Sequence, residues 1–264
     1  MINSSVFKNG LISLELAIKS ILVSQPKPEG EKSPYYDLAD KYKIKIDFRP
    51  FIKVVGVDSK EFRAQRINFS EYTGIILTSK VAVDHFFRVS EEIRYDVPDD
   101  LKYFCISEAV ALYLQKYVTY RKRKIFFGKQ TIEQLVEVMK KHKGEKFLLP
   151  CTDILRDNIP LTLEEQNIEF SKVILYKTVA ADLSDLEDVK YDMLVFFSPG
   201  GIESLFKNFP DFKQENTVIA AFGSTTAQAV VKNNLRLDLH APQPNAPSMV
   251  GAIEMFIKQN LKKG

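Results

Sequence analysis

Short, almost uninterrupted apolar runs recur along the chain and predict buried β-strands. Each run has four or five residues and is bounded by polar or turn-forming residues, as expected for strands. Because the runs are continuously apolar rather than alternating, they are typical of parallel strands that helices cover on both faces. The seven clearest runs are residues 20–24, 74–78, 103–106, 124–127, 146–149, 193–197 and 218–222.

Helical stripes lie between these runs. Apolar residues recur at the i, i+3, i+4, i+7 spacing that places them on one face of a helix. The clearest stripes are Ile132, Leu135, Val136 and Met139 and, near the C-terminus, Val250, Ile253 and Ile257. Strands that alternate with helices along a chain predict an α/β fold with a parallel sheet.

One strand–turn–helix pattern occurs twice. Segments 72–87 and 191–206 each contain an apolar strand, a serine at the turn and a helix that ends in an aromatic residue. Segments 21–25 and 147–151 form a second pair, whose members are 126 residues apart, against 119 residues in the first pair. Such internal repetition indicates one structural unit used more than once. We therefore predict two similar α/β lobes with a cleft between them.

The composition is that of a globular protein. Of 264 residues, 45% are hydrophobic and 27% are charged, which excludes disordered, collagen-like and coiled-coil chains. The 37 basic and 34 acidic residues leave a net charge of +3. A nucleic-acid-binding protein is expected to carry a larger surplus in a basic stripe, so we expect no nucleic-acid partner. The charge is compatible with a locally positive cleft for an anionic small molecule.

Cysteine, histidine and N-terminal patterns exclude further classes. Cys105 and Cys151 are too few for a disulfide framework, and three scattered histidines show no metal-ligand spacing. Charged residues interrupt the N-terminal apolar stretch 6–23, so we predict no signal peptide. The longest uncharged run, 216–231, is too short to span a bilayer. We expect a cytoplasmic protein with neither a metal nor a membrane partner.

Three strand-to-helix turns hold the candidate ligand-binding residues. They are Thr78-Ser79, Ser198-Pro199-Gly200-Gly201 and Gly223-Ser224-Thr225-Thr226-Ala227. In a doubly wound sheet, ligands bind outside the carboxyl ends of strands, where such turns lie, and unpaired N–H groups at a helix start attract anions. The alternative is that these residues only cap helices, because serine and threonine are favoured there regardless of function.

The glycines of the second turn favour a ligand site. Paired glycines at a helix start, here Gly200 and Gly201, indicate close backbone approach to another group. None of the turns matches GxGxxG or a P-loop, which disfavours a dinucleotide or nucleoside triphosphate.

Other polar residues give weaker signals. The basic segment 121–124 is most simply a solvated loop before a strand. On pattern alone, His85 is interpreted as structural, and Tyr176 as packing within an extended run. No Ser–His–Asp spacing occurs and Cys151 has no partner motif, so the residues show no strong acid–base or nucleophilic apparatus.

The order and spacing of several segments resemble the uroporphyrinogen-III synthase family, whose members close hydroxymethylbilane into an asymmetric tetrapyrrole. The matching segments are 75–79, 173–178, 195–202, 219–227 and the proline-containing loop 242–248. The resemblance covers about residues 20–260 and implies two α/β lobes, a two-stranded connector, an active-site cleft between the lobes and no cofactor. It also implies a linear tetrapyrrole polycarboxylate as substrate. A hinged two-lobe enzyme needs no second copy to form its cleft, so we expect a monomer.

The connector and the lobe boundaries follow from the same resemblance. Extended runs at 44–57 and 170–179 occupy equivalent places in the repeat and can cross between lobes side by side. The expected parts are a first lobe of residues 1–48 and 177–264, a second lobe of residues 52–172, and crossings near 49–51 and 173–176.

Individual residues match the family pattern unevenly. Tyr176 matches the family's tyrosine that is proposed to assist loss of the substrate hydroxyl, while Ser198 and Thr226 match its serine and second threonine at the later turns. The first repeat departs from the pattern. Ser24-Gln25-Pro26 stands where many members have Thr-Arg-Pro, and Ser107-Glu108 begins the segment that usually reads Gly-x-x-Thr-Ala.

This family's chemistry needs little acid–base apparatus. The bilane ionises readily and closes unaided to the symmetric isomer, so the main task is to hold a flexible polycarboxylate while its last ring inverts. We expect backbone N–H groups at the three turns to bind the carboxylates and the Tyr176 phenol to donate a hydrogen bond to the departing hydroxyl. One alternative is a noncatalytic two-lobe binding protein for an anionic metabolite. Another, a flavodoxin-like electron carrier, is disfavoured because tryptophan and a phosphate loop are absent.

Overall fold

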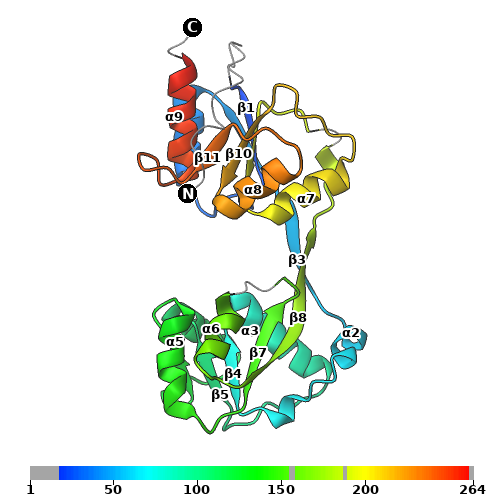
Figure 1. Ribbon diagram of the computed structural model, residues 1–264, viewed down its shortest axis with the longest axis vertical. Helices are drawn as coiled ribbons and strands as arrows, with labels where there is room; N and C mark the ends of the chain where they lie inside the picture. Colours follow the sequence, from blue (N-terminus) through cyan, green and yellow to red (C-terminus); the bar gives the residue numbers. More distant parts are fainter. Residues whose placement is uncertain (1–17, 155–157, 187–188, 262–264) are drawn as a thin grey trace. The chain divides into compact units, whose positions relative to one another are not determined.

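The chain forms two compact α/β units. The computed structural model describes residues 18–154, 158–186 and 189–261 (Figure 1). Unit 1 comprises the described residues through Lys53 and those from Ala180 onward, and unit 2 comprises Val54–Val179. Each unit has its own sheet, flanked by helices, and the predicted fold class is confirmed. Most of the N-terminal stretch 6–23 lies outside the described residues.

Unit 1 is built on a five-stranded parallel sheet in the order β11-β10-β9-β1-β2. Its strands are β1 (Ser20–Val23), β2 (Lys45–Phe48), β9 (Met193–Phe196), β10 (Val218–Phe222) and β11 (Leu239–Ala241). β1 pairs with both β2 and β9, so segments far apart in the sequence share one sheet. All residues of β9 are buried, as expected for a central strand covered on both faces.

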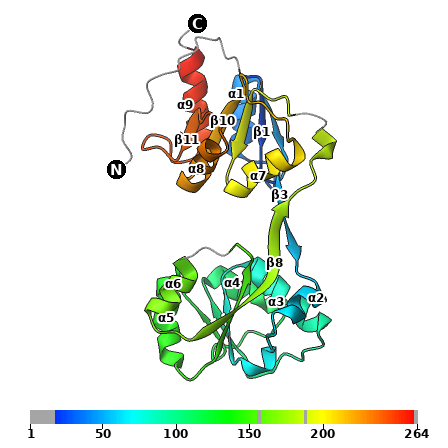
Figure 2. The same ribbon diagram turned by 45° about the vertical axis from the view of Figure 1, so that its right-hand side comes forward.

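Helices cover both faces of this sheet (Figure 2). In the described part of the chain they are α1 (Pro34–Tyr42), α7 (Pro199–Asn208), α8 (Ser224–Lys232) and α9 (Met249–Leu261), with a 3₁₀ turn η4 (Ser184–Leu186). Apolar residues of α1 and α9 share one core with the sheet, and those of α7 and α8 share the other. Strand β9 serves both cores, because its successive side chains point to opposite faces.

Unit 2 is built on a six-stranded sheet in the order β3-β8-β7-β4-β5-β6. Its strands are β3 (Ile52–Gly56), β4 (Gly74–Leu77), β5 (Lys102–Cys105), β6 (Ile125–Phe127), β7 (Phe147–Thr152) and β8 (Phe170–Ala180). The pairs from β8 to β6 are parallel. β3 runs antiparallel to β8, because the Val57 N–H donates to the Leu175 carbonyl oxygen and the Ala181 N–H donates to the Phe51 carbonyl oxygen. The chain leaves unit 1 in β3 and returns to it in β8.

Two helical layers flank the sheet of unit 2. One layer holds α2 (Ser59–Ala64), α3 (Lys80–Glu92) and α4 (Glu108–Tyr113), and the other holds α5 (Ile132–Met139) and α6 (Asn158–Glu165). Short 3₁₀ turns complete the unit at η1 (Phe69–Glu71), η2 (Leu114–Lys116) and η3 (Lys140–His142). The stripe predicted over residues 132–139 is helix α5, and the four residues of the stripe are buried.

The predicted strands and the observed strands differ in two places. All seven apolar runs form strands, but the extended run 44–57 is two strands rather than one, β2 in unit 1 and β3 beside β8. Pro50 lies at the break, and it has no N–H group with which to continue a ladder. β11 was not predicted, because its three residues are too few to show a pattern.

Candidate functional site

The predicted turns lie where parallel strands end. Thr78-Ser79 follows β4 in unit 2, whereas Ser198 follows β9 and Gly223 follows β10 in unit 1. β9 and β10 are neighbours, and β1, which ends before Ser24, lies on the other side of β9. Three consecutive strand ends of unit 1 therefore present turns at one edge of its sheet.

Two of the three turns are closed by their own serine. The Ser79 hydroxyl accepts a hydrogen bond of 3.0 Å from the Ala82 amide at the start of α3. The Ser198 hydroxyl accepts one of 3.3 Å from the Gly201 amide at the start of α7. At both turns the serine caps the following helix, as the alternative interpretation predicts. Thr78 lies half-buried one residue before the first cap.

The third turn is open. Gly223 is the N-cap of α8, has φ 85°, and gives the helix no side-chain cap. The alternative that these residues only cap a helix does not hold at this turn, because a glycine holds the cap position in a conformation that other residues avoid. The first N–H groups of a helix have no acceptor within it. At α8 they belong to Ser224, Thr225 and Thr226, of which the first two side chains are exposed and the third is buried.

Gly201 lies where two serine side chains converge. A Cβ atom at Gly201 would lie 3.3 Å from the Phe196 ring, 3.7 Å from the Ser24 hydroxyl and 3.8 Å from the Ser198 hydroxyl. The close approach predicted from the glycine pair is therefore made within the chain at Gly201. At Gly200 a Cβ would make only an ordinary contact of 3.5 Å, with Ile52.

Tyr176 is turned toward helix α3 by an irregularity in its strand. Cys151 of β7 lies opposite Ile174, yet the next residue, Thr152, lies opposite Tyr176, so β8 has one extra residue here. In a regular strand Leu175 and Tyr176 would point to opposite faces. Both instead join the core on the α3 side, as bulges allow.

The Tyr176 phenol and the Ser79 turn come together in unit 2. Tyr176 is only 8% exposed, and burial raises the pKa of its phenol, while an interaction with the Ser79 side chain opposes the rise. The phenol therefore keeps its proton at neutral pH and is a hydrogen-bond donor. Of the predicted residues, the structure brings Tyr176 together with Ser79, and Ser198 together with Gly201.

Side chains that the sequence did not single out hold the backbone before Tyr176. The Gln65 amide accepts from the Ile174 N–H at 2.7 Å and donates to its carbonyl oxygen at 2.8 Å. Arg88 Nη2 donates to the carbonyl oxygens of Leu175 and Val57 at 3.0 Å each. In the sequence, the available signal for the role of Arg88 was its i, i+3 spacing from His85 on the helix that follows Ser79.

The cysteines do not contribute reactive thiolates. Both are buried, and burial raises the pKa of Cys105 to about 12 and that of Cys151 to about 11. Among the described residues, no group of three or more histidine, cysteine or carboxylate side chains is placed to hold a metal ion. The described helices include none long and apolar enough to cross a membrane.

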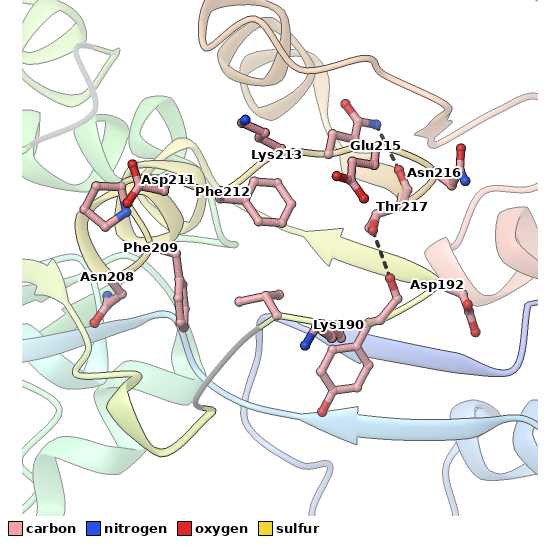
Figure 3. A pocket seen from close by; sticks show the side chains of 14 residues that line it. Lys190, Asp192, Asn208, Phe209, Asp211, Phe212, Lys213, Glu215, Asn216 and Thr217 are labelled. Carbon is pink, nitrogen blue, oxygen red and sulfur yellow. Dashed lines mark hydrogen bonds between the residues drawn. The ribbon is translucent and has the colours of Figure 1, made fainter.

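A depression of about 990 Å³ lies at the other edge of the unit 1 sheet (Figure 3). Its lining comes from segments 189–192 and 208–217, which lead into β9 and β10. The Thr217 hydroxyl donates to the Tyr191 carbonyl at 3.1 Å and ties the two segments together. Because the segments precede the amino ends of these strands, the depression contains none of the predicted turn residues.

Comparison with known proteins points to one family. The family model described as "Uroporphyrinogen-III synthase HemD" matches residues 35–251. The uroporphyrinogen-III synthase of Chlorobaculum parvum is 23% identical over 266 residues, 91% of this chain and 100% of that protein. The uroporphyrinogen-III synthase of Saccharomyces cerevisiae is 27% identical over 139 residues, 47% of this chain and 50% of that protein, so this match spans half of the yeast protein.

A solved structure shares the fold. The uroporphyrinogen-III synthetase of Helicobacter pylori is 16% identical and has a TM-score of 0.59, and the match covers 92% of this chain and 100% of that chain. At this identity the likeness concerns the fold alone.

Proposed function

Because this chain belongs to the uroporphyrinogen-III synthase family, we propose that it converts hydroxymethylbilane to uroporphyrinogen III, closing the ring with inversion of the last pyrrole and loss of water. The buried Tyr176 phenol beside the Ser79 turn is the observation that carries the proposal. A phenol that keeps its proton suits a departing hydroxyl, which needs a hydrogen-bond donor.

Tyr176 acts at the first step. The C–O bond of the hydroxymethyl group breaks with its electron pair on oxygen, and the phenol donates a hydrogen bond to that oxygen as charge develops. The oxygen leaves as water after taking up a proton, and the pyrrole of the same ring loses its N–H proton, so that the balance is one water lost. The substituted carbon of the last ring then bonds the methylene carbon and gives a spiro intermediate. The older C–C bond at that carbon breaks and re-forms at the free carbon of the same ring, which inverts the ring. The free carbon loses its C–H proton in this step, and that proton balances the N–H proton lost earlier. A positioned donor of this kind contributes roughly one to two orders of magnitude in rate.

The strand-end turns hold the carboxylates of the bilane. The uncapped start of α8, with the N–H groups of residues 224–226, attracts an anion through its donors and through the helix dipole. Thr78 and the turn Ser198–Gly201 offer further polar groups at strand ends. Holding a flexible polycarboxylate lowers the barrier by orientation rather than by strong acid–base chemistry.

The proposal includes a cytoplasmic monomer that acts on a small molecule and not on nucleic acid. The free, buried cysteines suit a reducing compartment, and the net charge of +3 is too small for a nucleic-acid-binding surface. Sedimentation at micromolar concentration tests the oligomeric state.

A coupled isomer assay tests the proposed function. Hydroxymethylbilane is generated in situ, the protein is added, and the oxidised products are separated into type I and type III uroporphyrin. Predominantly type III product establishes the activity, because unaided closure gives type I. Type I alone, from folded protein that binds the bilane, overturns it in favour of a noncatalytic binding protein.

A further inference from the structure

His85 and Tyr176 form a stacked pair. Their ring centroids are 5.1 Å apart and the planes are inclined by 18°, so the two rings lie face to face. His85 belongs to α3, six residues after the Ser79 cap, whereas Tyr176 belongs to β8. The stack therefore joins helix α3 to the strand that carries Tyr176.

Arg88 fixes the tautomer of the stacked imidazole. Arg88 Nε donates to His85 Nδ1 at 3.0 Å. A nitrogen that accepts a hydrogen bond carries no proton, so the neutral ring holds its proton on Nε2. If His85 gained a second proton, an N–H group would face the guanidinium N–H and the bond would be lost.

The guanidinium of Arg88 is itself held in place. It donates to the carbonyl oxygens of Leu175 and Val57 at 3.0 Å and pairs with Glu92 at 2.5 Å. Gly56 leaves room for it, since a Cβ atom there would lie 2.7 Å from two guanidinium atoms. One arginine therefore connects the backbone immediately before Tyr176 to the imidazole that stacks on the Tyr176 ring.

We propose that His85 is a positioning residue for Tyr176: its imidazole, held by Arg88, sets the orientation of the phenol toward the departing hydroxyl. The proposal rests on the function proposed above, with Tyr176 as the donor. The stack restricts rotation of the phenol ring about its axis to Cβ, and small displacements of a catalytic group cost large factors in rate.

The proposal predicts that the rate falls at acid pH, which gives the pH–rate profile an acid limb. The charged groups that act on His85 are Asp84, Arg88 and Glu92 of its own helix, and Tyr176 is the titratable group that faces it from β8. Burial, followed by the Arg88 charge, lowers the pKa of His85, and the two carboxylates oppose this. The imidazole is therefore neutral at pH 7. When the pH falls below the ordinary pKa range of histidine, His85 gains a proton, the hydrogen bond from Arg88 is lost and the stack on Tyr176 is released.

Three variants separate positioning from general structural support. His85→Ala removes the ring, His85→Phe keeps a flat ring that does not titrate, and His142→Phe is the matched control. His142 also packs on aromatic rings, at 4.2 Å from Phe126 and 5.3 Å from Phe104, but it lies in η3 before β7, away from the predicted turns. Each variant is assayed for kcat, KM and the ratio of type III to type I product between pH 5 and pH 8.

The expected pattern is specific to positioning. His85→Ala lowers kcat about ten-fold and raises the share of type I product, with little change in KM. His85→Phe recovers most of the lost kcat and lacks the acid limb, and His142→Phe keeps both the rate and the pH profile of the parent. Equal kcat and equal acid limb in the parent and His85→Ala overturn the inference, as does a His85→Phe variant no better than His85→Ala. A parent that yields only type I product instead overturns the proposed function.

Discussion

Helices α3 and α8 both begin at the carboxyl end of a buried strand, yet their starts offer different chemistry. At α3, the Ser79 hydroxyl caps the helix and also interacts with the buried phenol of Tyr176. At α8, Gly223 leaves the first N–H groups without a side-chain cap. The first start supports a side-chain donor, and the second leaves backbone donors available to an anion. Under the proposed function, the start of α3 supports the proton-donating group and the start of α8 binds an anion.

Removal of the phenol is expected to have the largest effect. Tyr176→Phe should lower kcat roughly ten- to hundred-fold, because the departing hydroxyl loses its donor, and the type III share of the product should fall. The matched control is Tyr103→Phe. Tyr103 is also a buried phenol in the same core of unit 2, and burial raises its pKa as well. Full rate and full isomer fidelity in Tyr176→Phe would remove Tyr176 from the mechanism.

A charge at the α8 start should act on binding rather than on chemistry. Thr225→Glu places a carboxylate beside the uncapped N–H groups, and Thr225→Gln adds nearly the same volume without charge. Thr225 is exposed, so both side chains fit. We expect Thr225→Glu to raise KM for the bilane about five- to ten-fold, since like charges close together in water repel by about 1 kcal/mol. The effect should weaken as salt is added.

The sign of the stability change makes this test sharper. A negative charge in the first turn of a helix stabilises it by about 0.5 kcal/mol. Thr225→Glu should therefore have a slightly higher Tm than Thr225→Gln while binding the bilane less tightly. An unchanged KM in both variants would mean that the α8 start binds no carboxylate.

The capping serines give a third, smaller contrast. Ser79→Ala and Ser107→Ala each remove the side-chain cap of a helix in unit 2, α3 and α4 respectively. Each should cost about 1 kcal/mol of unfolding free energy, measured by urea denaturation. Only Ser79→Ala should also lower kcat, by several-fold, because only Ser79 interacts with Tyr176. Equal activity in the two variants would show that Ser79 does no more than cap.

The fold was predictable because local pattern and tertiary context agree. Runs such as 74–78 and 193–197 are apolar throughout, and the corresponding strands β4 and β9 are buried on both faces. The break in the run 44–57 was harder to predict. Both halves are extended, and they differ only in the sheet that each half joins. Pro50 was the available signal.

The site was only partly predictable. Turn residues could be found because serine, threonine and glycine at strand ends have local causes. The partners of Tyr176 depend on a register shift between β7 and β8 that brings it to the face of His85. A shift of this kind is set by pairing between distant segments and leaves no mark in the residues nearby. The interpretation of His85 as merely structural rested on its own helix, without that contact.

The smallest expected effect comes from Glu254, which lies in unit 1 but away from its turns. It tests whether a general loss of stability in unit 1 has the same consequence for substrate binding as a change at the α8 start. Glu254 of α9 bonds Lys41, Tyr42 and Lys258, and these partners lower the pKa of its carboxyl from 4.5 to about 2. A carboxyl whose pKa is lowered in the folded state stabilises the fold, and this stabilisation is fully present when the pH is above the ordinary pKa of the carboxyl. That stabilisation declines as the pH falls toward about 2.

Glu254→Gln should therefore be slightly less stable than the parent at pH 7, and the gap should close on acidification below about pH 4. Urea midpoints at both pH values measure the gap, and surface pairs of this kind contribute little, so the difference should be small. KM for the bilane should match that of the parent. If Glu254→Gln raised KM as much as Thr225→Glu does, the α8 start would lose its special place, and the contrast between the two helix starts would reduce to the stability of unit 1 as a whole.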